Sequence, residues 1–110
     1  MSFELRTISN FDRELKRLVK KYPSIKADLL ALMESLLMDP FQGDGLGKDC
    51  YKVRMKITSK GKGKSAGSRV ITCVKVINKR ITLISIYDKS DQADISDNLL
   101  LQILKDNGLI

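Results

Sequence analysis

The chain has 110 residues, 43% of them hydrophobic, which is enough to bury the core of one domain over residues 1–110. It contains no His, which excludes an imidazole base or metal ligand, and its two Cys, Cys50 and Cys73, lie far apart without a metal partner. No apolar run approaches the ~18 residues of a membrane span, and the first ten residues lack a signal-peptide core, so we expect a soluble cytoplasmic protein.

The net charge of +7 is concentrated in the middle of the chain. Residues 1–47 carry seven cations and seven acids, residues 48–80 carry eleven cations and one acid, and residues 81–110 carry two cations and five acids. Solubility alone would not require the cations to gather in one third of the chain. A basic segment within a balanced domain favours a surface that binds a polyanion.

The first half of the chain predicts one strand and two helices. Residues 2–8 alternate apolar and polar residues, as a half-buried strand does. Ser9 and Asp12 have the spacing of a capping box, and the helix that follows ends at Pro23. A second helix, starting directly after that proline, is closed by Pro40. A glycine-rich connection then leads to a region with a period of two.

Residues 51–58 predict a strand with one buried and one exposed face. The exposed face carries a row of cations, namely Lys52, Arg54 and Lys56. This row leads directly into a stretch of glycines and lysines, so a hairpin at that point would gather many positive charges in one place.

The second half of the chain predicts two more strands and a helix. Residues 69–77 and 80–87 have the composition of strands and are joined at Asn78-Lys79, where Asn tolerates a tight hairpin. Ser96 can cap a final short helix. The expected order is therefore β-α-α-β-β-β-α, an α+β domain in which a small antiparallel sheet is covered by helices on one face.

The stretch from Ser59 to Arg69, SKGKGKSAGSR, contains four cations, three glycines and no acid. It is not a nucleotide-binding P-loop, because Thr58 stands where the first glycine of that motif belongs and a strand follows in place of a helix. A solvated hairpin loop is the plain alternative. The stronger interpretation is an RNA-binding surface, in which glycines let the backbone approach phosphates and cations attract them, namely Lys56, Lys60, Lys62 and Lys64.

Three stretches together resemble the RelE/ParE superfamily of bacterial toxins, and in particular its HigB-like branch. They are CYKVR at residues 50–54, KGKGKSAGSRVI at residues 60–71 and IYDKS at residues 86–90. The middle stretch is the specific one, since HigB-like proteins carry a similar lysine-glycine sequence followed by an arginine. The order of the predicted elements agrees with this superfamily, whose fold we therefore expect.

The resemblance implies the toxin of a type II toxin-antitoxin system. Such a toxin cleaves messenger RNA on the ribosome by attack of a ribose 2′-hydroxyl on the adjacent phosphate, without a metal or other cofactor. The implied partners are the ribosome, its mRNA and a cognate antitoxin, which we expect to be a helix-turn-helix protein of the HigA type.

The resemblance also assigns candidate catalytic residues. Lys52 and Arg54 match a basic pair on the second strand of the family, Arg69 matches an arginine that stabilises the transition state, and Lys89 matches a basic residue after the fourth strand. The family pattern has a catalytic tyrosine where this chain has approximately Ile95. Tyr87 lies nearby and is the candidate that remains.

Two other functions fit the same sequence. The ParE-like branch of the superfamily inhibits DNA gyrase and does not cut RNA, and the dense cations disfavour it. A non-catalytic RNA-binding module would usually show aromatic residues for base stacking, of which the basic region offers only Tyr51 and Tyr87.

Overall fold

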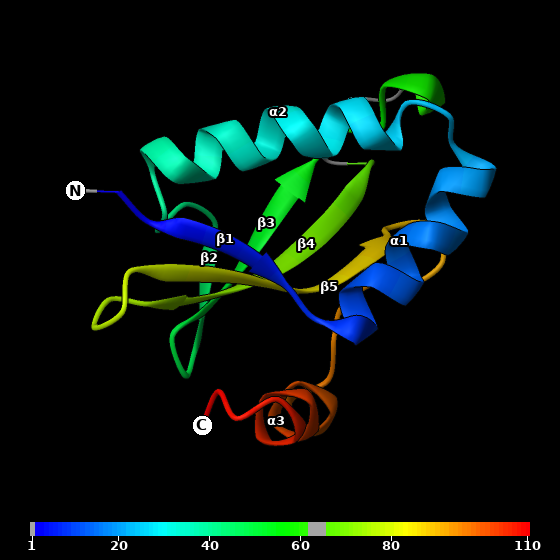
Figure 1. Cartoon of the computed structure of the whole chain (residues 1–110). Coiled ribbons are helices and arrows are strands. Elements are labelled where there is room, and N and C mark those ends of the chain that lie inside the picture. Colours follow the sequence, from blue (N-terminus) through cyan, green and yellow to red (C-terminus); the bar gives the residue numbers. More distant parts are fainter. Residues whose placement is uncertain (1, 62–65) are drawn as a thin grey trace.

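The computed structural model describes residues 2–61 and 66–110, which form a five-stranded sheet and three α-helices (Figure 1). The elements in chain order are β1 (Glu4–Thr7), α1 (Ser9–Lys21), α2 (Ile25–Met38), β2 (Asp44–Gly47), β3 (Cys50–Met55), the short 3-10 helix η1 (Thr58–Lys60), β4 (Ser68–Lys75), β5 (Arg80–Asp88) and α3 (Asp97–Asp106). The predicted α+β class is confirmed, and β2 is added to the predicted order. Within the described ranges, no helix has the length and hydrophobicity that crossing a membrane requires.

The strands lie in the order β1-β5-β4-β3-β2, and the sheet is mixed. β1 runs parallel to β5, whereas the other neighbouring strands are antiparallel. The expected all-antiparallel sheet is wrong in this detail. A hairpin makes two consecutive strands antiparallel. The alternation in residues 2–8 predicts a strand but does not predict whether it pairs parallel or antiparallel with a strand far away in the sequence.

The helices cover both faces of the sheet, which corrects the expectation of a single covered face. α1 and α2 lie on one face, and α3 lies on the other (Figure 1). The reason is visible in β4 and β5, where nearly every residue is buried, so both faces need a cover. Beneath α3, Cys50 and Cys73 are cross-strand neighbours, both buried and both free thiols.

A bulge interrupts β5 at Ile84, which has no counterpart in β4: Ser85 pairs with Ile71, and Leu83 pairs with Thr72. A bulge leaves backbone groups without a ladder partner. Two side chains of α1 take them up. Asn10 donates to the carbonyl of Ile84 at 3.0 Å, and a Glu14 carboxylate oxygen accepts from the N–H of Ile86 at 3.3 Å and from the Ser85 hydroxyl at 2.8 Å. α1 is therefore fixed to β5 just before Tyr87.

The ends of the elements follow the sequence in part. Ser96 caps α3 as predicted and accepts from the N–H of Leu99 at 3.1 Å. Ser9 is already inside α1, which is capped by Ile8 without a side-chain hydrogen bond. In the turn between β4 and β5 the left-handed residue is Lys79, with φ +49°, and not Asn78.

The start of β4 is packed closely on the end of β3. A Cβ atom added at Gly67 would lie 2.5 Å from the carbonyl oxygen of Met55 and 2.9 Å from Cα of Lys56. The Gly67 carbonyl also accepts from the N–H of Lys89 at 3.0 Å. Only a residue without a side chain allows this approach, so Gly67 holds together the ends of three strands.

Gly67→Ala should lower the free energy of unfolding by about 1–3 kcal/mol, because backbone atoms must move to admit the methyl group. The matched control is Gly45→Ala in β2, where an added Cβ meets no atom within 4 Å. Urea denaturation followed by circular dichroism measures both. Equal stability of the two variants would contradict the close packing described for Gly67.

Candidate functional site

The sheet register places three candidate residues in one row. Arg54 of β3 lies opposite Arg69 of β4, and Arg69 lies opposite Tyr87 of β5. Opposed residues of antiparallel strands point to the same face, with Cβ atoms about 4.5–5.5 Å apart. We call Arg54, Arg69 and Tyr87 the Arg-Arg-Tyr row. It lies on the α3 face, since Arg69 alternates along β4 with Ile71 and Cys73 of the α3 core, and Tyr87 itself belongs to that core.

The two arginines of the row differ in burial. Arg69 is only 5% exposed, and its guanidinium donates to the carbonyl of Ser68 at 3.1 Å. Arg54 is exposed. A buried guanidinium is held in one position before a ligand arrives, whereas an exposed one can move to meet it. The pair therefore offers one fixed and one adjustable donor to an anion.

Tyr87 completes the row and is 4% exposed. Its hydroxyl is buried and forms no hydrogen bond with a described residue. Burial raises the pKa of Tyr87 to about 12, and the nearby charge of Asp94 adds to this, while Arg69 opposes it. The hydroxyl therefore stays protonated at neutral pH, so it can donate a proton or a hydrogen bond but cannot act as a base.

Lys52 lies two residues before Arg54 on the same face of β3, and its partner is an acid that the sequence analysis missed. The Lys52 Nζ lies 3.4 Å from both carboxylate oxygens of Asp94. The N–H of Ile95 donates to Asp94 and lowers the pKa of that carboxyl, and the charges of Lys52 and Lys89 lower it further. Asp94 is thus ionised beside the row. The polar stretch after β5 contains three acids, but no spacing singles out this one.

Lys89 belongs to the same neighbourhood. It follows β5 directly, and its Nζ donates to the carbonyl of Ala93 at 3.3 Å. Three of the five candidate catalytic residues form the row, and the other two, Lys52 and Lys89, lie near the Asp94 carboxylate, whose charge also acts on Tyr87. The structure therefore brings all five together, namely Lys52, Arg54, Arg69, Tyr87 and Lys89.

The predicted RNA-binding lysines have different surroundings. Lys60 is turned away into the protein: its Nζ lies 2.6 Å from an Asp88 carboxylate oxygen, 2.6 Å from the Ser90 hydroxyl and 3.1 Å from the carbonyl of Ala66. Lys56 is exposed. Lys62 and Lys64 lie outside the described residues. The ion pair gives Lys60 a structural position, which leaves it little charge to offer to RNA.

Asp88 is the partner of Lys60 and is buried at the end of β5. Its carboxylate also accepts from the Tyr22 hydroxyl at 2.5 Å and from the N–H of Ser90 at 2.9 Å. Burial alone would raise the pKa of Asp88, but the hydrogen bonds from Lys60, Tyr22 and Ser90 outweigh it and lower the pKa to about 2. One carboxylate therefore joins the end of α1, the helix η1 and the segment after β5.

A second carboxylate, Asp28 of α2, holds the start of η1. It accepts from the N–H of Thr58 at 2.9 Å, from the Thr58 hydroxyl and from the Ser24 hydroxyl at 2.8 Å. The Ser24 hydroxyl accepts in turn from the N–H of Ser59 at 2.8 Å. The residues that precede the glycine-lysine stretch are thus fixed to α2 and to β5 by buried acids.

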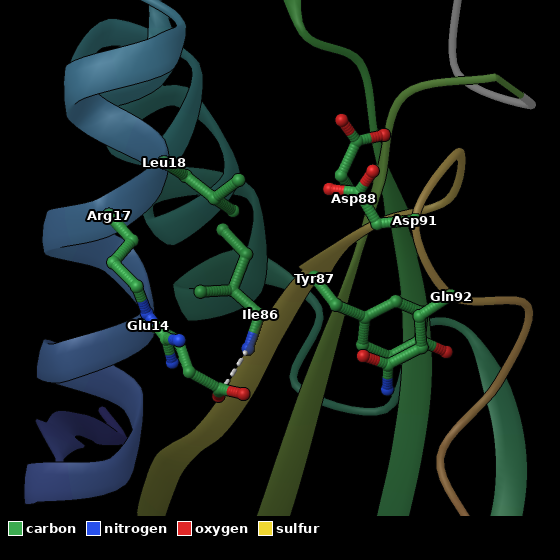
Figure 2. Close-up of a pocket in the computed structure, with 8 residues that line it drawn as sticks. All are labelled: Glu14, Arg17, Leu18, Ile86, Tyr87, Asp88, Asp91 and Gln92. Carbon is green, nitrogen blue, oxygen red and sulfur yellow. Dashed lines mark hydrogen bonds between the residues drawn. The ribbon is translucent and has the colours of Figure 1, made fainter.

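Three cavities border the row among the described residues. One of about 440 Å³ lies at the β2–β3 edge and is lined by Gln42, Gly43, Asp44, Lys52, Val53 and Arg54. A second, of about 210 Å³, lies between α2 and β3 and is lined by Asp28, Ala31, Leu32, Ser35, Gln42, Arg54, Met55 and Lys56. A third, of about 200 Å³, lies between α1 and β5 and is lined by Glu14, Arg17, Leu18, Ile86, Tyr87, Asp88, Asp91 and Gln92. Figure 2 shows that Glu14, Arg17 and Leu18 project from α1 toward β5, whereas Tyr87 projects away from α1.

The arrangement suits an anion with several oxygens. Two guanidinium groups, the Lys52 ammonium and the Tyr87 phenol lie on the same face of three neighbouring strands. Preorganised donors of this kind stabilise charge that develops on phosphoryl oxygens. Among the described residues, no three His, Cys, Asp or Glu side chains gather where they could hold a metal ion.

No known family model matches the chain. Solved structures do resemble it. A mutant of the E. coli toxin RelE in the free state, with two arginines replaced by alanine, matches at 19% identity over 96% of this chain and 97% of that one, with a TM-score of 0.62. The RelBE2 toxin-antitoxin complex from Mycobacterium tuberculosis matches at 11% identity over 80% of this chain and 99% of that one, with a TM-score of 0.58. The chain therefore has the RelE fold, as the sequence resemblance implied.

Asp88→Asn should lower the free energy of unfolding at pH 7 by about 2–4 kcal/mol, because it leaves the half-buried Lys60 without its counter-charge. The pKa of Asp88 in the folded state, about 2, lies below the unfolded value of about 4. Its contribution is therefore complete above about pH 4 and is lost as the pH falls through about 2.

Chemical denaturation between pH 2 and pH 7 measures this difference. The control is Asp91→Asn, which removes an exposed carboxylate 3.8 Å from Lys21 and should change stability by less than about 1 kcal/mol. A stability gap between wild type and Asp88→Asn that did not narrow at low pH would show that the carboxylate charge is not what stabilises this junction.

Proposed function

We propose that the protein is the toxin of a type II toxin-antitoxin system and an endoribonuclease that cleaves messenger RNA on the ribosome. The observation that carries the proposal is the Arg-Arg-Tyr row, in which two arginines and a tyrosine from three neighbouring strands are aligned on one face of a RelE fold. The HigB-like sequence motif that ends at Arg69 supports the same assignment. So small a domain relies on the ribosome to hold the RNA in a reactive geometry.

The proposed reaction is an in-line attack without a metal or cofactor. The ribose 2′-oxygen bonds to the adjacent phosphorus, the bond to the 5′-oxygen breaks, and a 2′,3′-cyclic phosphate remains. Arg69 and Arg54 hold the charge that develops on the phosphoryl oxygens, and Lys52 and Lys89 add positive charge beside them.

Proton transfer is assigned by ionisation state. Tyr87 is protonated at neutral pH and supplies a proton to the leaving 5′-oxygen. Asp94 is ionised and contacts Lys52, so it can accept the proton of the 2′-hydroxyl. The proton lost by the nucleophile and the one gained by the leaving group then balance.

The proposed partners follow from the same assignment. One of the similar structures is a toxin-antitoxin complex, which supports a cognate antitoxin for this chain. We expect a helix-turn-helix protein of the HigA type, drawn to the basic segment between residues 48 and 80 by charge complementarity. Exposed Lys56, together with Lys62 and Lys64, would attract RNA through general phosphate contacts.

Arg69→Ala should cut the rate of mRNA cleavage by about 100-fold or more, because a preorganised donor to the transition state is lost. Arg69→Lys should restore little, since an ammonium group cannot grip two phosphoryl oxygens as a guanidinium does. The measurement is single-turnover cleavage on programmed ribosomes, with circular dichroism to confirm folding.

Arg54→Ala gives a second test of the site. Arg54 is exposed, so its replacement should leave the core intact, and it should also slow cleavage.

In cells, expression of the wild type should arrest growth and produce transcript ends within translated codons. Folded Arg69→Ala that cleaves at the wild-type rate would contradict the proposed site. Growth arrest with intact transcripts and broken DNA would favour the gyrase inhibitor, and binding without cleavage would favour an RNA-binding module.

Tyr87→Phe should separate activity from stability. The hydroxyl is buried without a described hydrogen-bond partner, so its removal should leave the free energy of unfolding unchanged or raise it by about 1 kcal/mol. The cleavage rate should nevertheless fall by about 10²-fold, the scale of a lost general acid. Thermal unfolding and ribosome cleavage, measured on the same preparation, decide the matter: a destabilised or fully active variant would assign Tyr87 a purely structural role.

A further inference from the structure

The cavity of about 440 Å³ at the β2–β3 edge adjoins the Arg-Arg-Tyr row through Arg54. Of its lining residues, the proposed reaction uses Lys52 and Arg54 and leaves Gln42, Gly43, Asp44 and Val53 without a role. In the sheet register Asp44 of β2 stands opposite Lys52 of β3, so the two side chains share the α3 face. Neighbouring strands are about 4.8 Å apart. Asp44 is therefore one strand beyond Lys52 and Arg54, where a nucleotide next to the reacting phosphate would lie.

The cavity presents hydrogen-bond acceptors next to cations. Asp44 forms no ion pair with a described residue. The side-chain nitrogen of Gln42 donates to the Ser35 hydroxyl at 2.9 Å and to the carbonyl of Asp39 at 3.2 Å, which leaves the amide oxygen as the group that can accept from a ligand. Lys52 and Arg54 provide donors on the opposite side.

The segment that carries these acceptors is held firmly against β3. Gly43 has φ +100°, and a Cβ added there would lie 2.6 Å from the carbonyl oxygen of Lys52. Only glycine allows this approach, and it fixes the backbone on both sides of Gly43. Gln42 and Asp44 are thus positioned by packing, as the groups of a selective site need to be.

The negative charge of Asp44 opposes phosphate binding by the neighbouring cations Lys52 and Arg54. A site for phosphate alone would therefore not need Asp44. A site for a nucleobase would. Guanine has two donors, N1–H and the N2 amino group, on one edge, and two acceptors, O6 and N7, that suit an arginine. A carboxylate can take both donors while Arg54 takes an acceptor. Adenine, cytosine and uracil lack this combination.

We propose that the cavity lined by Gln42, Asp44 and Arg54 binds the guanine base of the nucleotide next to the scissile phosphate. This assignment deepens the proposed ribonuclease function and rests on it for the position of the base along the RNA. The volume lies within the range of about 300–1,000 Å³ that is common for ligand sites. Asp44 is then the residue that gives the toxin its base preference.

The first experiment is single-turnover cleavage of programmed mRNAs that differ only by guanine or adenine at the position next to the cut. The wild type should prefer guanine by about 10-fold, the discrimination expected from one bidentate base contact. Asp44→Asn should cleave the guanine substrate more slowly and lose the preference, because an amide nitrogen opposes the donors of guanine. Asp12→Asn, which removes an equal charge from exposed α1, should behave as the wild type. Equal rates of the wild type on both substrates would overturn the proposal.

The second experiment does not depend on cleavage. Titration of the folded protein with 5′-GMP or 5′-AMP, followed by backbone NMR shifts, should show tighter binding of GMP at residues 42–44 and 52–54 and no such difference in Asp44→Asn. Selective GMP binding without any RNA cleavage would contradict the ribonuclease function but keep the site. Equal shifts with both nucleotides, or GMP shifts confined to other residues, would overturn the guanine site even if the protein cleaves RNA.

Discussion

The ion pair between Asp88 and Lys60 is the interaction on which the candidate site depends. A buried carboxylate at the end of β5 is kept ionised by Lys60, Tyr22 and the backbone of Ser90. The next residue toward the N-terminus is Tyr87, whose side chain points to the other face of the sheet (Figure 2). The α1–α2 side of the sheet therefore fixes the end of the strand, and the opposite side uses that fixed backbone to present the row.

Across the rest of the sheet, too, the α1–α2 side fixes the backbone and the α3 side carries the candidate site residues. On the α1–α2 side, Asn10 and Glu14 satisfy the bulged backbone of β5, and Asp28 fixes the residues that leave β3. On the α3 side, β3 and β4 carry the cations of the candidate site, namely Lys52, Arg54 and Arg69. Buried polar networks of this kind tend to specify one arrangement more than they add stability. Here the arrangement that they specify is the alignment of Arg54 with Arg69 and of Arg69 with Tyr87.

Much of this could be predicted from the sequence, and the exceptions have physical reasons. The cations on β3 share one face because alternation along a strand is a local property, and the motif ending at Arg69 was specific enough to indicate the RelE fold, which is confirmed. The parallel pairing of β1, the position of α3 and the contact of Asp94 with Lys52 all depend on segments that meet only in the folded chain. In the sequence, Lys60 could not be told apart from the other lysines of the basic stretch. Only its contact with the buried Asp88 in the folded chain gives it a different role.

The parallel pairing of β1 with β5 also bears on how the protein is made. β1 is the first of the described strands to be synthesised and β5 the last, so the sheet cannot close before β5 has left the ribosome. Pairings so distant in sequence form slowly, because a long loop must be closed first. Arg69 and Tyr87 lie on the two strands of the β4–β5 hairpin, so their alignment also requires β5. A nascent chain that has not yet produced β5 therefore lacks the aligned row, and the site assembles only after this strand has been synthesised.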